Sequence, residues 1–183
     1  MELLHSVSEF FHEAVTTAMK AQHVAAAEET EFYLVNLLTA YTTAVVDEEP
    51  LALKLAQASE AAPGERVKTL KEVGDTSLYV SGFFADSLAR RLVDVDYYMT
   101  MGGAAYGQLA RLSRSAPFEE LADKFPRFVD VLNEIRAATN FTSSSNVLRL
   151  YEQWRATGGE WLEKRLRASG VLLPAPGDGK ISH

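Results

Sequence analysis

The stretch from Lys71 to Gly107 constrains the fold most, because it holds two mostly apolar segments, each containing glycines, in direct succession. Apolar residues recur there at the spacing that places them on common faces of an α-helix. Two successive apolar helices cannot both stay in water, so the other segments of the chain must cover them. We therefore predict a helical protein that is organised around this stretch.

The other segments show the same helical periodicity, and no segment alternates as a half-buried strand does. Prolines and glycines mark the breaks between them. Pro126 either kinks the sixth expected helix or begins its second half. We predict an all-α fold: a single-domain bundle of about seven helices around a long central helix. The expected helices cover residues 3–27, 28–46, 51–61, 65–92, 96–113, 117–139 and 147–170.

Residues 1–170 are expected to form the single domain, and residues 171–183 a loosely ordered C-terminal tail. The net charge of −7 is spread along the chain, so no basic stripe is expected to bind nucleic acid. There is no cysteine, no N-terminal signal pattern and no apolar run long enough for a membrane span. These features predict a soluble, cytoplasmic protein.

The N-terminal segment offers one metal-binding pattern, formed by His5, Glu9 and His12. Glu9 and His12 have the Glu-x-x-His spacing that carboxylate-bridged di-iron bundles use. Such a bundle needs a second pair of this kind, and the chain has none. The three side chains also share the helix face opposite Phe10 and Phe11, which indicates a solvated face or an oligomer contact. They remain weak metal candidates.

One face of the central helix carries charged and aromatic residues together, at spacings of four and three. A carboxylate buried there needs a hydrogen-bonded or charged partner, which Tyr79, Arg90 or Arg91 could supply. The face is interpreted either as a pocket between helices 65–92 and 96–113 or as a structural network. The candidate pocket residues are Asp75, Tyr79, Phe83, Asp86 and Arg90, with Tyr97, Tyr98 and Tyr106 from the following helix.

Gly102 and Gly103 occupy adjacent positions in an expected helix, where each costs about 1 kcal/mol relative to alanine. Either a close helix crossing or room for a ligand would account for them, and the close crossing is the favoured interpretation. Phosphate-binding loops, nucleophile elbows and zinc signatures are missing from the sequence. No cofactor can be named.

Three functions remain in competition. The first is a non-enzymatic interaction or regulatory module that associates with itself or with a protein partner. It is supported by the many apolar helix faces and by the weakness of every catalytic or binding motif. The second is a small-molecule-binding protein or enzyme with its pocket between helices 65–92 and 96–113. The third is a metal-binding bundle that uses Glu9 and His12.

Overall fold

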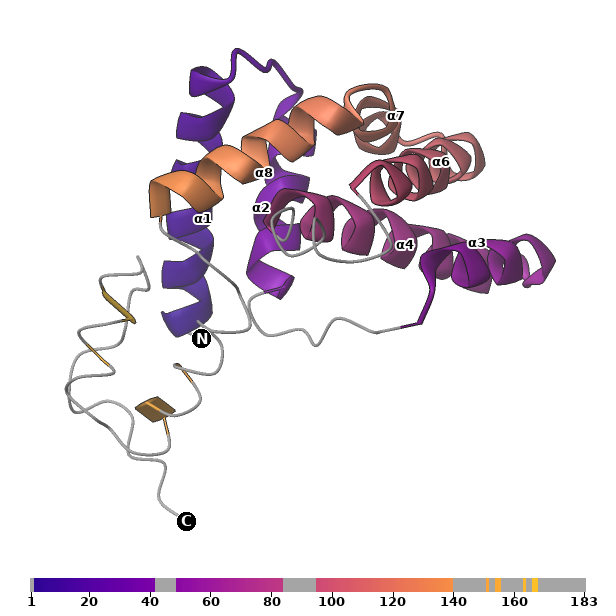
Figure 1. The fold of residues 1–183 in the computed structure, drawn as a ribbon, viewed down its shortest axis with the longest axis horizontal. Helices are drawn as coiled ribbons and strands as arrows, with labels where there is room; N and C mark the ends of the chain where they lie inside the picture. Colours follow the sequence, from indigo (N-terminus) through magenta and orange to yellow (C-terminus); the bar gives the residue numbers. More distant parts are fainter. Residues whose placement is uncertain are drawn as a thin grey trace.

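A computed structural model describes residues 2–41, 49–83 and 95–139, with six further residues between 151 and 167. Seven α-helices and no strand occur in these described residues, which confirms the prediction of an all-α bundle around a long central helix. Figure 1 shows the helices crossing one another in several directions. They are α1 (Glu2–Ala21), α2 (Glu28–Tyr41), α3 (Leu51–Glu60), α4 (Pro63–Phe83), α6 (Val95–Ser113), α7 (Ala116–Asp123) and α8 (Phe125–Thr139).

The central helix is α4, which contacts α2, α3, α6 and α8. From Leu70 to Phe83 it is buried on nearly all sides, although it carries serine, threonine, glycine and aspartate there. Its small residues allow neighbours to approach. A Cβ atom on Gly82 would lie 2.3 Å from Leu132 of α8. Both faces of this helix are therefore covered over its described part. The predicted continuation to residue 92 lies outside the described residues.

Gly102 and Gly103 differ in their surroundings: Gly102 is packed against neighbouring side chains, whereas Gly103 is not. A Cβ atom on Gly102 would lie 2.4 Å from Phe125 and 2.6 Å from Ser77 on α4, so α6 and α4 cross closely at this point. Gly103 has no such neighbour within 4 Å. The close-crossing interpretation thus holds for Gly102, and Gly103 faces open space.

The first helix is shorter than the sequence predicts. It ends at Ala21 instead of residue 27, because His23 adopts a left-handed backbone conformation with φ of 54°. The Val24 amide donates to the Met19 carbonyl at 2.9 Å, which closes the helix in the manner of a Schellman motif. Glycine usually occupies this position, so the sequence AQHVAAAEE gave no stop signal.

Side chains from α7 and α8 hold the turn between α1 and α2. The Arg127 guanidinium donates to the Gln22 carbonyl at 2.6 Å, and Glu120 accepts from the Ala27 amide at 2.9 Å. Ala27 immediately precedes α2, so Glu120 satisfies a donor that has no partner within the helix. These distant contacts explain why local alanine propensity did not extend α1.

Pro126 lies in the first turn of α8, so it begins the second half of the predicted sixth helix. Lys124 alone separates α7 from α8. None of the described helices is long and apolar enough to cross a membrane. The predicted helix 147–170 and the predicted tail 171–183 lie outside the described residues, apart from six single positions.

Candidate functional site

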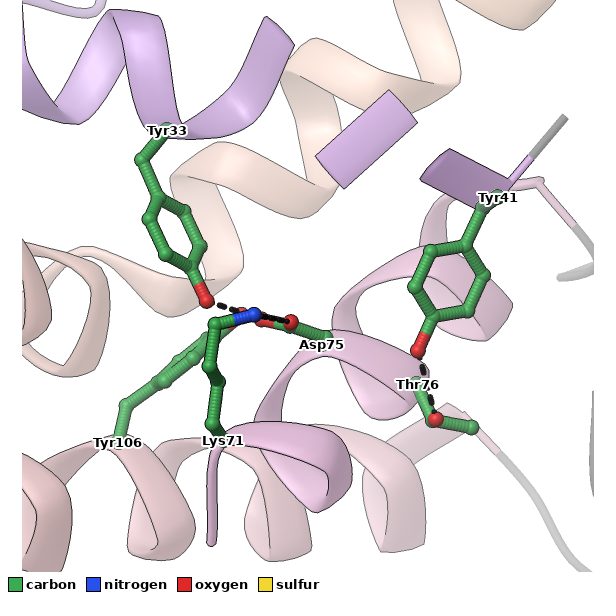
Figure 2. A network of polar contacts seen from close by, with 6 residues as sticks. All are labelled: Tyr33, Tyr41, Lys71, Asp75, Thr76 and Tyr106. Atoms are coloured by element: carbon green, nitrogen blue, oxygen red, sulfur yellow. Dashed lines mark hydrogen bonds and ion pairs between the residues drawn. The ribbon is translucent and has the colours of Figure 1, made fainter. Parts of the chain in front are cut away.

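The carboxylate of Asp75 is at the centre of a polar network that joins three helices (Figure 2). Its side chain is 8% exposed. Oδ1 accepts hydrogen bonds from the Tyr33 hydroxyl at 2.5 Å and the Tyr106 hydroxyl at 2.7 Å. Oδ2 accepts from Lys71 Nζ at 2.7 Å. We call Tyr33, Lys71, Asp75 and Tyr106 the Asp75 network.

Each member of the network is positioned by its helix. Lys71 lies one turn before Asp75 on α4, a spacing at which side chains meet. Its ammonium also lies 5.3 Å from the centroid of the Tyr33 ring. Tyr106 reaches Asp75 from α6 across Gly74, because a Cβ atom at Gly74 would lie 2.5 Å from the Tyr106 ring. Gly74 therefore leaves the space that the ring occupies.

Both phenols of the network are held in the protonated form. Burial raises the pKa of Tyr106 well above its ordinary value, and the negative charge of Asp75 raises it further. Burial, followed by the charge of Asp75, raises the pKa of Tyr33 in the same way. A tyrosine with a raised pKa donates a hydrogen bond and does not act as a base or nucleophile near neutral pH.

The arrangement satisfies the carboxylate with groups of the chain itself. A carboxylate oxygen has about two lone-pair sites, and both sites of Oδ1 are taken by phenols. Oδ2 has one further site beside Lys71, whose side chain is 50% exposed. Chemically, the network joins α2, α4 and α6, and Lys71 is its most exposed member.

Tyr79 and Phe83, two other predicted pocket residues, belong to an aromatic cluster on α4. Both side chains are buried. The Tyr79 ring contacts the Phe83 ring at a centroid distance of 5.1 Å and the Tyr41 ring of α2 at 4.7 Å. The Tyr41 hydroxyl forms a 2.8 Å hydrogen bond with Thr76, and burial raises the pKa of Tyr41 to about 12. This cluster packs α2 against α4.

Tyr97 and Tyr98 lie at the start of α6, and Tyr97 is nine residues, or about 13 Å of helix, before Tyr106. The Tyr97 hydroxyl accepts from the Ala52 amide at 2.9 Å, so it satisfies a free donor in the first turn of α3. The two rings meet edge to face at 5.5 Å. Of the predicted tyrosines on α6, Tyr106 is the one that the structure brings to Asp75.

The remaining predicted candidates fall into two groups. Asp86, Arg90 and Arg91 lie outside the described residues, as does the side chain of His5. Glu9 and His12 are exposed on α1. Within the part of the chain that the structure describes, no group of three or more histidine, aspartate or glutamate side chains is placed to hold a metal ion.

Sequence reasoning missed Tyr33, Lys71 and Tyr41 as parts of this region. Lys71 carried a usable signal, because it precedes Asp75 by four residues. Tyr33 and Tyr41 carried a weaker one: a helix that is apolar on nearly all sides is buried, and a buried tyrosine hydroxyl needs a hydrogen-bond partner. That partner for Tyr33 is Asp75, the buried carboxylate that the sequence did single out.

Comparisons of the chain with protein-family models, with curated proteins and with solved structures each gave no match.

Proposed function

We propose that this chain is a non-enzymatic, all-helical interaction module that associates with itself or with a protein partner in the cytoplasm. The proposal treats the interior as a rigid support and the helix surfaces as the part that acts. It includes no nucleic-acid partner, because the net charge is −7 and a phosphate backbone attracts basic surfaces.

The observation that carries the proposal is the internal satisfaction of Asp75. The carboxylate accepts from two phenols and an ammonium, all of them from the same chain. A general base or acid needs a free site that faces a substrate and a pKa suited to proton transfer. The phenols have raised pKa values, and Oδ1 has no free site. A structural network fits these features better than an active site does.

Exposed apolar side chains on several helices supply a second argument for association. Phe32 on α2 is 61% exposed, and Leu112 on α6 is 50% exposed. Burial of such side chains against another protein surface is favourable by about 25 cal/mol per Å² of apolar area. Association would therefore be driven by surface residues, while the Asp75 network keeps the helices in place.

A small-molecule pocket at the Asp75 network is the second candidate, and one observation favours it. Lys71 is half-exposed, so solvent reaches one side of a site where a carboxylate, two phenols and an ammonium meet. A ligand that displaced the Lys71 ammonium would find a hydrogen-bond acceptor beneath it.

Native mass spectrometry of the purified protein, with the denatured protein as reference, separates the two candidates. A module that associates with itself should appear as a dimer or larger assembly whose mass is a multiple of the polypeptide mass, and one that binds a different protein should appear as a monomer without additional mass. A monomer that carries additional mass, lost on denaturation, would contradict the proposal and favour the small-molecule pocket.

A further inference from the structure

A groove of about 270 Å³ lies between α1 and α8, on helices that take no part in the Asp75 network. Figure 1 shows α8 lying across α1. Phe10, Ala14 and Ala18 of α1 line the groove together with Ile135 of α8. Ala18 and Ile135 are buried at its floor, whereas Phe10 and Ala14 are half-buried. The groove is therefore apolar inside and open above.

The shape of the groove suits a helix. Its α1 residues recur at intervals of three and four, so they form one straight strip along the helix. Two of them are alanines, and small side chains let another backbone approach closely. Grooves of this kind receive the apolar strip of an amphipathic helix, with side chains at positions i, i+3, i+4 and i+7 as anchors.

The charges beside the groove indicate which helix fits. Glu13 of α1 and Glu134 of α8 are among its lining residues, and none of those residues is basic. Glu134 also accepts a hydrogen bond from Gln22 at 2.9 Å, which holds its carboxylate in place. A helix seated on the apolar strip meets these two carboxylates, so lysine or arginine beside its own apolar strip would be attracted.

The same charges disfavour a second copy of this chain as the occupant. A symmetric pairing through the groove would bring the Glu13 and Glu134 carboxylates of one copy close to those of the other. Like charges placed together across an interface are unfavourable. The groove thus differs from a self-association face.

We propose that the α1–α8 groove binds a basic amphipathic helix of a partner protein, with apolar side chains in the groove and lysine or arginine against Glu13 and Glu134. This inference rests on the proposed interaction-module function and adds the class of partner. Self-association, where it occurs, uses another surface.

The test uses the full-length protein and a synthetic helical peptide of about 18 residues, or five turns. The peptide carries leucine along one strip and lysine on both sides of it, and a second peptide has glutamate in place of each lysine. Fluorescence anisotropy of labelled peptide measures binding. We expect the lysine peptide to bind, with affinity that falls as salt is added, and the glutamate peptide to bind at least about tenfold more weakly.

Two substitutions locate the binding. Ala14→Trp fills the groove, and we expect it to weaken lysine-peptide binding at least about tenfold. Glu13→Lys reverses an exposed charge without altering the packing, and we expect a loss of about twofold to fivefold. Ala104→Trp on α6 and Glu60→Lys on α3 are matched controls at exposed positions, and binding should be unchanged in both. Thermal melting verifies that each variant is folded.

Equal binding of the two peptides, no binding of either, or unchanged binding by folded Ala14→Trp and Glu13→Lys would overturn the inference. Loss of a native dimer in Glu13→Lys would also overturn it, because a second copy would then occupy the groove. If the lysine peptide does not bind but native mass spectrometry shows an assembly without additional mass, a basic helix is rejected as the partner. The proposed interaction-module function then still stands. A monomer with additional mass rejects the proposed function itself.

Discussion

The Tyr106 hydroxyl of α6 donates a 2.7 Å hydrogen bond to Asp75 of α4, on the same carboxylate oxygen that accepts from Tyr33 of α2. One buried oxygen thereby connects three helices that are distant in sequence. Hydrogen bonds to a charged acceptor are stronger than neutral ones, contributing about 1.5–3 kcal/mol each. The contact also depends on Gly74, since a side chain there would meet the Tyr106 ring.

The raised pKa of Tyr106 predicts a loss of stability at alkaline pH. In the unfolded chain the phenol ionises near pH 10, whereas burial beside Asp75 keeps it protonated in the folded chain to higher pH. The stability that the protonated Tyr106 hydroxyl contributes is therefore complete below pH 10. It is lost as the pH rises through the pKa of Tyr106 in the folded chain. Tyr106→Phe removes this contribution, so the free energy of unfolding should fall less steeply with pH, by up to about 1.4 kcal/mol per pH unit.

Urea denaturation of the wild type and Tyr106→Phe between about pH 9 and pH 11 measures the two slopes. At neutral pH the variant should be less stable by about 1–3 kcal/mol, because Asp75 loses a buried donor. Identical slopes in the two proteins would show that Tyr106 ionises as readily in the folded chain as in the unfolded one.

Gly102 and Gly103 should respond in opposite ways to the same substitution. Gly102→Ala places a methyl group about 2.4 Å from Phe125 and 2.6 Å from Ser77, so it should destabilise the fold, and Gly102→Leu should do so more severely. Gly103→Ala places the methyl group in open space within a helix and should stabilise the fold by about 0.4–1 kcal/mol. Thermal melting checks both. An unchanged melting temperature for Gly102→Leu would refute the close helix crossing.

Glu120 should stabilise the start of α2 from outside that helix. Burial opposes its ionisation, but hydrogen bonds that include those from the Ala27 amide and Lys124 outweigh burial and lower its pKa. Glu120→Ala removes an acceptor that acts as an N-cap, so we expect a loss of about 0.5–2 kcal/mol and faster hydrogen exchange at the Ala27 amide. Glu119→Ala, at the exposed neighbouring position, is the matched control. Equal exchange rates at Ala27 in both variants would contradict this role.

The all-α fold and the position of the central helix could be predicted because helical periodicity is a local property of the sequence. Whether Asp75 is buried could not be predicted, because its burial depends on which neighbouring helices cover that face of α4. Tyr33 could not be assigned as its partner, because 42 residues separate them and the packing of α2 on α4 decides the contact. The predicted end of α1 at residue 27 was wrong for a similar reason. His23 takes a position that favours glycine, and Arg127, 105 residues after Gln22, holds the turn.

For the same reason, the described residues of the predicted pocket lie in separate contacts and not around one cavity. Spacing placed Asp75, Tyr79 and Phe83 on one face of α4, and all three are buried there. Spacing alone could not say that α2 would supply partners to that face, Tyr33 for Asp75 and Tyr41 for Tyr79. The partner on each neighbouring helix determines whether such a face becomes a pocket or a packing surface.

The free energy of unfolding of Asp75→Ala tests the central claim most directly, with Asp123→Ala at an exposed position of α7 as control. If the Asp75 network is structural, the variant leaves the buried Tyr106 phenol and the partly buried Tyr33 phenol without their acceptor. It should then lose about 3–5 kcal/mol, while the control changes by less than about 0.5 kcal/mol. Residues that serve binding or catalysis usually lower the stability of the fold, so replacing one of them tends to leave stability unchanged or raise it. An Asp75→Ala protein as stable as the wild type, or more stable, would contradict the structural account and indicate a functional site at Asp75.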